Sequence, residues 1–78
     1  MELIEVTARF LPDGKINPIE LVLDGRRYTI EDTGRRWQDE NGLHILVMVG
    51  GLRVWELIFQ ATEGRWYMKN PARNPGLV

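Results

Sequence analysis

The 78-residue sequence contains no cysteine and no serine, and it has one histidine, His44. Without cysteine the chain forms no disulfide and no thiolate-ligated metal site, so packing, strand pairing or association must stabilise the fold. Without serine or a second histidine, a serine-hydrolase triad and a two-histidine metal centre are excluded as well. These absences favour a non-enzymatic binding domain, for which we expect neither a cofactor nor a metal.

Long apolar runs and a strong net charge are also missing. The longest apolar stretch, residues 43–49, is interrupted by His44 and is far shorter than the roughly 18 residues that span a membrane. The sequence opens with Met1-Glu2 and lacks the basic and then apolar segments of a signal peptide. The 10 basic and 11 acidic residues nearly balance, so no overall positive charge attracts nucleic acid or anionic lipid. We therefore expect a cytoplasmic protein that does not contact a membrane.

The sequence does contain regular alternation of apolar and polar residues. Residues 3–10 alternate without a fault, with Ile4, Val6 and Ala8 on one side. A period of two is typical of a half-buried β-strand, and helical spacing fits no long segment of the chain. Turn residues then divide the chain at Asp24-Gly25, Asn41-Gly42, Gly50-Gly51 and residues 61–64.

This pattern predicts an all-β domain over residues 1–69. We expect an antiparallel meander of about six strands, curled into a small barrel or half-barrel that is SH3-like or similar. Residues 70–78 contain two prolines and no periodicity, and we expect them to form a flexible C-terminal tail.

Each turn also predicts which residues lie opposite each other. The expected pairs are Leu21 with Tyr28, Trp37 with Leu46, Leu46 with Trp55, Val47 with Val54, and Phe59 with Trp66. Tyr28 and Trp37 can share the core face only if the strand between them contains one extra residue. We predict a β-bulge at Gly34, because glycine reaches positive φ without steric cost.

This register makes both faces of the central hairpin apolar. One face carries the expected core residues Trp37, Leu46, Met48, Trp55, Leu57, Phe59, Trp66 and Met68. The opposite face must also be covered. Three covers are possible: the chain's own first strand or 12–18 loop, a second copy of the chain, or a different protein. Our leading hypothesis is a protein-interaction or self-association module that binds another protein or forms a homodimer. Its predicted interaction surface consists of Arg36, Ile45, Val47, Val54, Ile58 and Tyr67.

His44 belongs to the one group of residues with acid–base potential. The Asn41-Gly42 turn places Asp39 across the hairpin from His44, with Glu40 nearby, and a neighbouring carboxylate orients an imidazole and raises its pKa. Acidic residues before Asn-Gly are also ordinary turn residues. We therefore predict no catalytic residues and no metal ligands.

Arginines alternate with aromatic residues in three short segments. The arginines concerned are Arg26, Arg27, Arg35, Arg36 and Arg65. Proteins that bind single-stranded nucleic acid use aromatic rings to stack bases and guanidinium groups to hold phosphates. The alternation, however, assigns Tyr28, Trp37 and Trp66 to the core, and acidic residues flank the arginines. We therefore favour a solvated face with arginine–carboxylate pairs across strands, and keep nucleic-acid binding as the alternative.

Two resemblances accompany these patterns. Over roughly residues 2–68 the chain looks like short uncharacterised bacterial proteins, a resemblance that implies no particular activity. The segments that carry it are Ile4-Glu5-Val6-Thr7-Ala8-Arg9-Phe10, Gly25-Arg26-Arg27-Tyr28, Gly34-Arg35-Arg36-Trp37, Leu43-His44-Ile45-Leu46-Val47-Met48 and Trp55-Glu56-Leu57-Ile58-Phe59.

The second resemblance covers residues 23–37. This stretch is similar to part of a small bacterial domain associated with translesion-polymerase-like repair proteins, in which a tryptophan follows a Gly-Arg-x-Tyr element. In this chain Trp37 follows Tyr28 by nine residues. The resemblance implies an accessory domain linked to DNA repair. Together with the arginine–aromatic pattern, it gives the alternative hypothesis of a single-stranded nucleic-acid-binding accessory domain.

Overall fold

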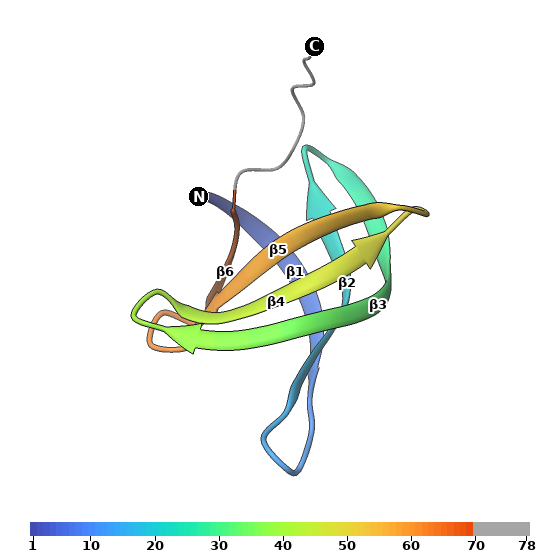
Figure 1. The fold of residues 1–78 in the computed structure, drawn as a ribbon. Helices are drawn as coiled ribbons and strands as arrows, with labels where there is room; N and C mark the ends of the chain where they lie inside the picture. The colour runs from blue at the N-terminus through green and yellow to red at the C-terminus, as the bar shows by residue number, and fades with distance from the viewer. Residues whose placement is uncertain (70–78) are drawn as a thin grey trace.

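The computed structural model describes residues 1–69, which form six antiparallel β-strands and no helix. The strands are β1 (Glu2–Phe10), β2 (Ile16–Leu23), β3 (Arg26–Asp39), β4 (Gly42–Val49), β5 (Arg53–Gln60) and β6 (Arg65–Met68). Each strand pairs with the next, and β1 also pairs with β6, so the sheet closes into a small barrel (Figure 1). The predicted all-β barrel of about six strands is confirmed. The predicted tail, residues 70–78, lies outside the described residues.

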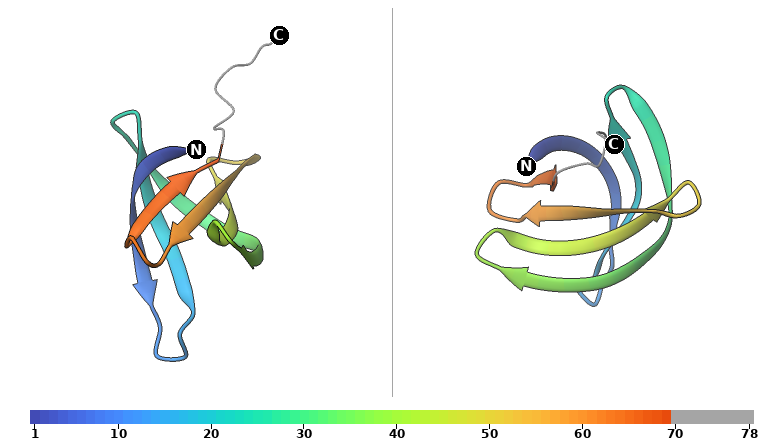
Figure 2. Two further views of the ribbon diagram at one scale, coloured as in Figure 1. Left: turned by 90° about the vertical axis from the view of Figure 1, so that its left-hand side faces the viewer. Right: turned by 45° about the horizontal axis from the view of Figure 1, so that its top comes forward.

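Every connection joins neighbouring antiparallel strands, so successive turns lie at alternating ends of the barrel. β1 and β2 extend beyond the other strands, and the turn between them projects from the barrel in the views of Figures 1 and 2. Because residues 1–69 contain no helix, that part of the chain offers no helical segment able to cross a membrane.

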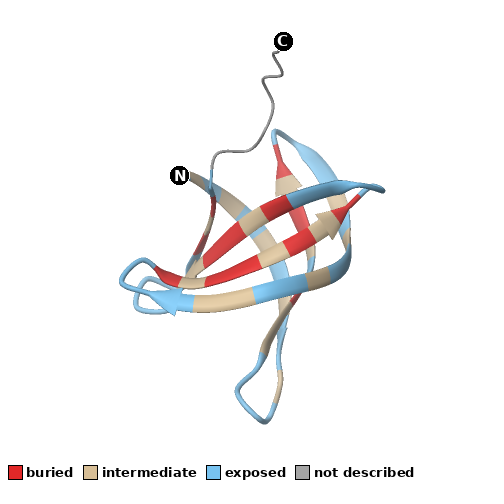
Figure 3. Cartoon of the chain, viewed as in Figure 1, coloured by how far each residue is buried: buried red, intermediate tan, exposed pale blue. Residues whose placement is uncertain are grey.

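The barrel interior holds the hydrophobic core. Its buried members are Leu21, Leu23, Ile45, Val47, Val49, Trp55, Leu57, Trp66 and Met68. β4 and β5 contribute most of them, and Figure 3 shows the buried segments concentrated on these two strands. Tyr28 packs edge-to-face on Trp55, with ring centroids 5.0 Å apart, and Phe59 lies 4.8 Å from Trp66. The β4–β5 hairpin therefore supplies most of the hydrophobic core.

The β2–β3 hairpin has the predicted register. Leu21 lies opposite Tyr28, and Leu23 lies opposite Arg26. Asp24 and Gly25 both have positive φ, 53° and 76°, as a two-residue type I′ turn requires. The expected pairing of Phe59 with Trp66 across β5 and β6 is also confirmed.

The β3–β4 hairpin is displaced by two residues from the prediction. Asp39 pairs with Gly42, so the turn is Glu40-Asn41, and Trp37 lies opposite His44 instead of Leu46. A shift of two residues leaves every side chain on the same face of its strand. The predicted partner of Trp37 was wrong, but its grouping with the even-numbered residues of β4 is retained.

The β4–β5 hairpin differs from the prediction by one residue, which inverts the faces. Val49 pairs with Arg53, so the loop contains three residues, Gly50, Gly51 and Leu52. Val47 consequently lies opposite Trp55, and the predicted pairs Leu46–Trp55 and Val47–Val54 are wrong. The odd-numbered apolar residues of β4 face the core with Trp55 and Leu57, and the even-numbered ones face outward.

β3 contains two irregularities, of which the sequence predicted one. Its register against β4 shifts between Thr33 and Arg36, around Gly34, and again between Ile30 and Asp32. Each shift adds one residue to β3. One added residue would turn the following side chains to the other face of the sheet, and the second added residue turns them back. Trp37 therefore faces outward and not into the core as predicted. Gly34 is not among the residues with positive φ, so the bulge does not use the conformational freedom of glycine.

Candidate binding surface

A row of five cross-strand neighbours crosses the outer face of the barrel. Trp37 on β3 pairs with His44 on β4, His44 with Ile58 on β5, Ile58 with Tyr67 on β6, and Tyr67 with Leu3 on β1. His44 is 4 % exposed and Ile58 1 % exposed, although both lie outside the core cluster. The outer face of an antiparallel sheet is usually polar, so a largely apolar row with buried members marks this face as unusual.

His44 is held between two carboxylates. Its Nε2 lies 2.8 Å from Oδ1 of Asp39, and its Nδ1 lies 2.7 Å from Oε2 of Glu56. The Trp37 ring stacks on the imidazole, with centroids 4.9 Å apart and an interplanar angle of 13°. Ionised carboxylates only accept hydrogen bonds, so this geometry suits an imidazole that donates from both ring nitrogens, which is the protonated form. We call Asp39, His44 and Glu56 the histidine clasp.

The protonation behaviour of the clasp follows from these contacts. Burial by itself would lower the pKa of His44, but the hydrogen bonds to Glu56 and Asp39 outweigh burial and raise the pKa above its ordinary value. The hydrogen bond from His44 and the backbone N–H of Asn41 lower the pKa of the Asp39 carboxyl. The contacts of the clasp therefore favour the protonated form of the His44 imidazole.

The expected contact between Asp39 and His44 is present. Asp39 was predicted to lie directly opposite His44, but Trp37 lies there and Asp39 is two residues further along β3. Glu40 lies exposed in the turn, and the second carboxylate is Glu56, which sequence analysis missed. The available signal was an acidic residue in the middle of an otherwise apolar strand. Because both imidazole nitrogens are occupied, the ring has no free nitrogen for proton transfer. Within residues 1–69 no three acidic or histidine side chains converge as metal ligands.

Next to the clasp, β4 and β5 expose a group of aliphatic side chains. Met48 and Val54 are cross-strand neighbours, Leu46 lies two residues from Met48 on the same face, and Leu52 is the last residue of the loop. Val54 is 55 % exposed and Leu52 98 % exposed, while Leu46 and Met48 are partly exposed. We call Leu46, Met48, Leu52 and Val54 the apolar patch.

The six residues of the predicted interaction surface do not share one surface. Ile45 and Val47 have 0 % exposure inside the barrel, so the chain itself covers them. Arg36 lies opposite Ile45, and its Nη1 donates a hydrogen bond of 2.5 Å to the carbonyl oxygen of Ile16. The physical reason is the one-residue displacement of the β4–β5 register, which assigned the interior face of β4 to the outside.

The other three residues, Val54, Ile58 and Tyr67, do lie on the outer face. Val54 is exposed, whereas Ile58 is covered by its neighbours. The Tyr67 hydroxyl donates a hydrogen bond of 2.7 Å to Glu63, and this bond raises the pKa of Tyr67 above its ordinary value. Three of the six residues predicted for the interaction surface therefore lie on the outer face.

The arginines of the alternative hypothesis do not gather into one patch. Arg26 and Arg27 lie beside the β2–β3 turn, whereas Arg65 begins β6 at the opposite end of the barrel. Arg27 forms an ion pair with Glu20, and the Arg35 guanidinium lies 5.1 Å from the centroid of the Trp37 ring. The expected arginine–carboxylate pairing is thus present for Arg27.

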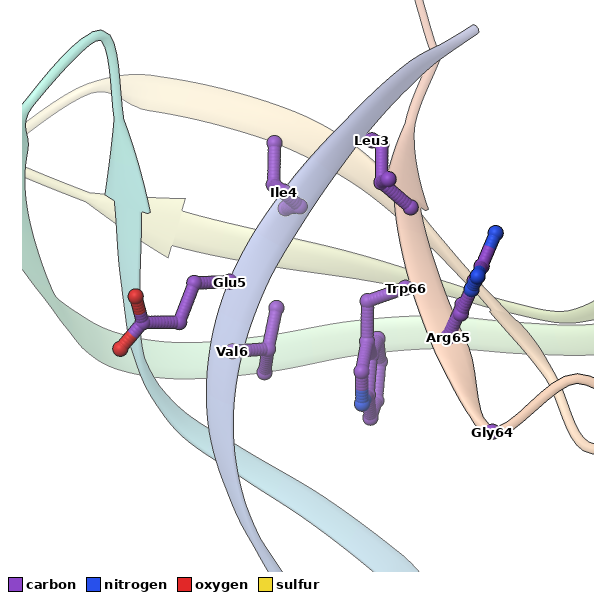
Figure 4. Close-up of a pocket in the computed structure, with 7 residues that line it drawn as sticks. All are labelled: Leu3, Ile4, Glu5, Val6, Gly64, Arg65 and Trp66. Carbon is purple, nitrogen blue, oxygen red and sulfur yellow. The ribbon is translucent and has the colours of Figure 1, made fainter.

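An open hollow lies at the seam where β1 and β6 meet. It has a volume of about 370 Å³ and is lined by residues 3–6 of β1 and 64–66 of the last turn and β6. Figure 4 shows the two strands separating toward Gly64, with the Trp66 ring between them. The hollow is remote from the apolar patch, which lies near the β4–β5 turn at the other end of the barrel.

Comparisons with protein-family models, curated proteins and solved structures find no match for this chain.

Proposed function

We propose that this chain is a small non-enzymatic β domain that binds a protein partner through the apolar patch of β4 and β5. The partner is another protein or a second copy of the chain. The observation that carries the proposal is the exposure of Val54 and Leu52 beside Met48, on the outside of a barrel whose interior is filled by other side chains.

The chemistry of the patch supports protein binding. Removing apolar surface from water favours association, and exposed aliphatic clusters are common at protein interfaces. Trp37 and Arg35 lie on the neighbouring strand, and these residue types are enriched at such interfaces. The histidine clasp holds Trp37 in place before binding, which lowers the entropy lost when a partner docks.

The cytoplasmic location and the absence of a cofactor remain part of this proposal. They are supported by the lack of cysteine and by the occupied nitrogens of the one histidine.

The test compares two lysine substitutions at exposed β-branched residues. Val54→Lys introduces a charge into the apolar patch, whereas Thr29→Lys introduces the same charge on the outside of β3, opposite Glu20. A photo-crosslinker at position 48 should capture the partner with the unchanged protein and with Thr29→Lys, and fail with Val54→Lys. Equal capture by all three proteins would contradict the proposal.

A further inference from the structure

β1 has a free edge over most of its length. Its ladder with β6 consists of Glu2–Met68, Leu3–Tyr67 and Ile4–Trp66. Beyond Ile4, residues 5–10 pair with β2 on one side, and no strand within residues 1–69 pairs with them on the other. The hollow of Figure 4 is the beginning of this gap. An unpaired strand edge presents backbone N–H and C=O groups that readily accept another strand.

The free edge is regular enough to accept a strand. The β1–β2 ladder shifts between Thr7 and Ala8, but the additional residue there, Ile19, belongs to β2. β1 itself continues without interruption from Glu5 to Arg9. Five residues of strand span about 17 Å, which is a usual length for a pairing partner.

The side chains of this segment complement those of a second copy. Glu5, Thr7 and Arg9 are exposed and lie on the outer face of β1. Within residues 1–69, neither Glu5 nor Arg9 takes part in an ion pair or a side-chain hydrogen bond. If two β1 strands run antiparallel with Thr7 opposite Thr7, each Glu5 lies opposite an Arg9. Opposite charges directly across an antiparallel ladder are stabilising, and like charges there are destabilising.

The same alignment also matches the inner face of the strand. Val6 lies opposite Ala8 of the second copy in both halves of the ladder, so apolar side chains meet apolar ones. Phe10, which is 64 % exposed and touches Phe59 edge-to-face, lies at the end of the ladder, where a second barrel would cover it. β6 occupies the edge at Glu2, Leu3 and Ile4, which restricts the new ladder to residues 5–9.

We propose that two copies of this chain associate through the free edge of β1, in an antiparallel ladder centred on Thr7. The contact is isologous, because the same five residues of each copy form both sides of a two-fold interface. This surface is separate from the apolar patch, so the inference does not depend on the function proposed above.

Charge reversal tests the inference with the full chain in sedimentation equilibrium. The unchanged protein should dimerise. Glu5→Arg places arginine opposite arginine twice, Arg9→Glu places glutamate opposite glutamate twice, and each should weaken the dimer by at least about tenfold. A mixture of the two variants should form a heterodimer, because both arginines of one copy then lie opposite both glutamates of the other. The double variant Glu5→Arg/Arg9→Glu should dimerise again.

Val54→Lys is the matched control, since it alters the apolar patch and leaves the β1 edge unchanged. It should leave the dimer intact. A monomeric unchanged protein at about 100 μM, where even weak complexes are populated, would overturn the inference. A dimer that persists in Glu5→Arg would also overturn the inference. If Val54→Lys abolishes that dimer and Glu5→Arg does not, self-association belongs to the apolar patch.

Discussion

The inner and outer faces of β4 are both apolar, yet different interactions stabilise them. On the inner face Ile45, Val47 and Val49 are fully buried against apolar side chains of the barrel. On the outer face His44 is buried by two carboxylates and a tryptophan ring, and its neighbour Leu46 stays partly exposed. Apolar composition alone therefore does not identify the core face of a strand. The three-residue loop at 50–52 and the two bulges of β3 determine which face of β4 points into the barrel.

The largest effect is expected from truncating the inner face. Ile45→Ala should lower the free energy of unfolding by about 3 kcal/mol, because it removes buried methyl groups and leaves a cavity. Leu46→Ala, one residue later on the outer face, should cost about 1 kcal/mol, because Leu46 is already partly in contact with water. Urea denaturation of the two variants measures the difference. Equal losses would mean that the two faces of β4 are equivalent.

Breaking the histidine clasp should have the next largest effect. His44→Gln leaves at least one of the two carboxylates without its donor and should lower the free energy of unfolding by about 2 kcal/mol. Glu40→Gln is the control, because Glu40 lies exposed in the neighbouring turn and should change stability by less than about 0.5 kcal/mol. If both variants unfold at the same urea concentration, the clasp contributes nothing to stability.

The smallest effect is expected in how pH changes the difference in unfolding free energy between the unchanged protein and His44→Gln. The pKa of His44 is raised above 6.5 in the folded protein, so its stabilising contribution is complete below that pH and is lost as the pH rises through the folded value. The pKa of Asp39 is lowered below 3.8, so its contribution is present above that pH and is lost as the pH falls through the folded value.

The stability advantage of the unchanged protein over His44→Gln should therefore be greatest between about pH 4 and pH 6.5 and decline on both sides. Urea midpoints measured across this range provide the test. An advantage that grows steadily with alkaline pH would show that the imidazole is neutral in the folded protein.

The sequence alone predicted the fold class and two of the hairpin registers. The Asp24-Gly25 turn was decisive for β2 and β3, because both residues adopt the positive φ that a two-residue turn needs and Leu21 meets Tyr28 only in that register. Phe59 and Trp66 were paired correctly because the turn at residues 61–64 has a fixed length and brings the two aromatic residues opposite each other.

The register of β4 and β5 could not be predicted in the same way. A one-residue displacement normally exchanges an apolar face for a polar one, but β4 is apolar on both faces, so the pattern gives no penalty for the wrong choice. Gly50-Gly51 suits a two-residue turn as well as the three-residue loop that includes Leu52. The second bulge of β3 has no glycine, and nothing in its composition distinguishes Glu31 from a regular strand residue.

The candidate site was accordingly predicted in part. The proximity of His44 and Asp39 followed from a turn of nearly correct position, since a displacement by two residues keeps both side chains on one face. Glu56 was missed because the predicted pairing of Leu46 with Trp55 displaced β5 by one residue and put Glu56 on the opposite face from His44. Arg36 was assigned correctly to the side of Ile45 and Val47, but that side is the interior.

The closure of the barrel has a consequence for how the chain folds. Five of its six strand contacts join neighbours in the sequence, and such local ladders form quickly. The contact of β1 with β6 joins the two ends of the described chain and consists of three residue pairs. Loop closure makes this contact the most costly in entropy and its short ladder makes it the least stable. We therefore expect barrel closure to be the last step of folding and the seam at β1 to be the first part of the native protein to open.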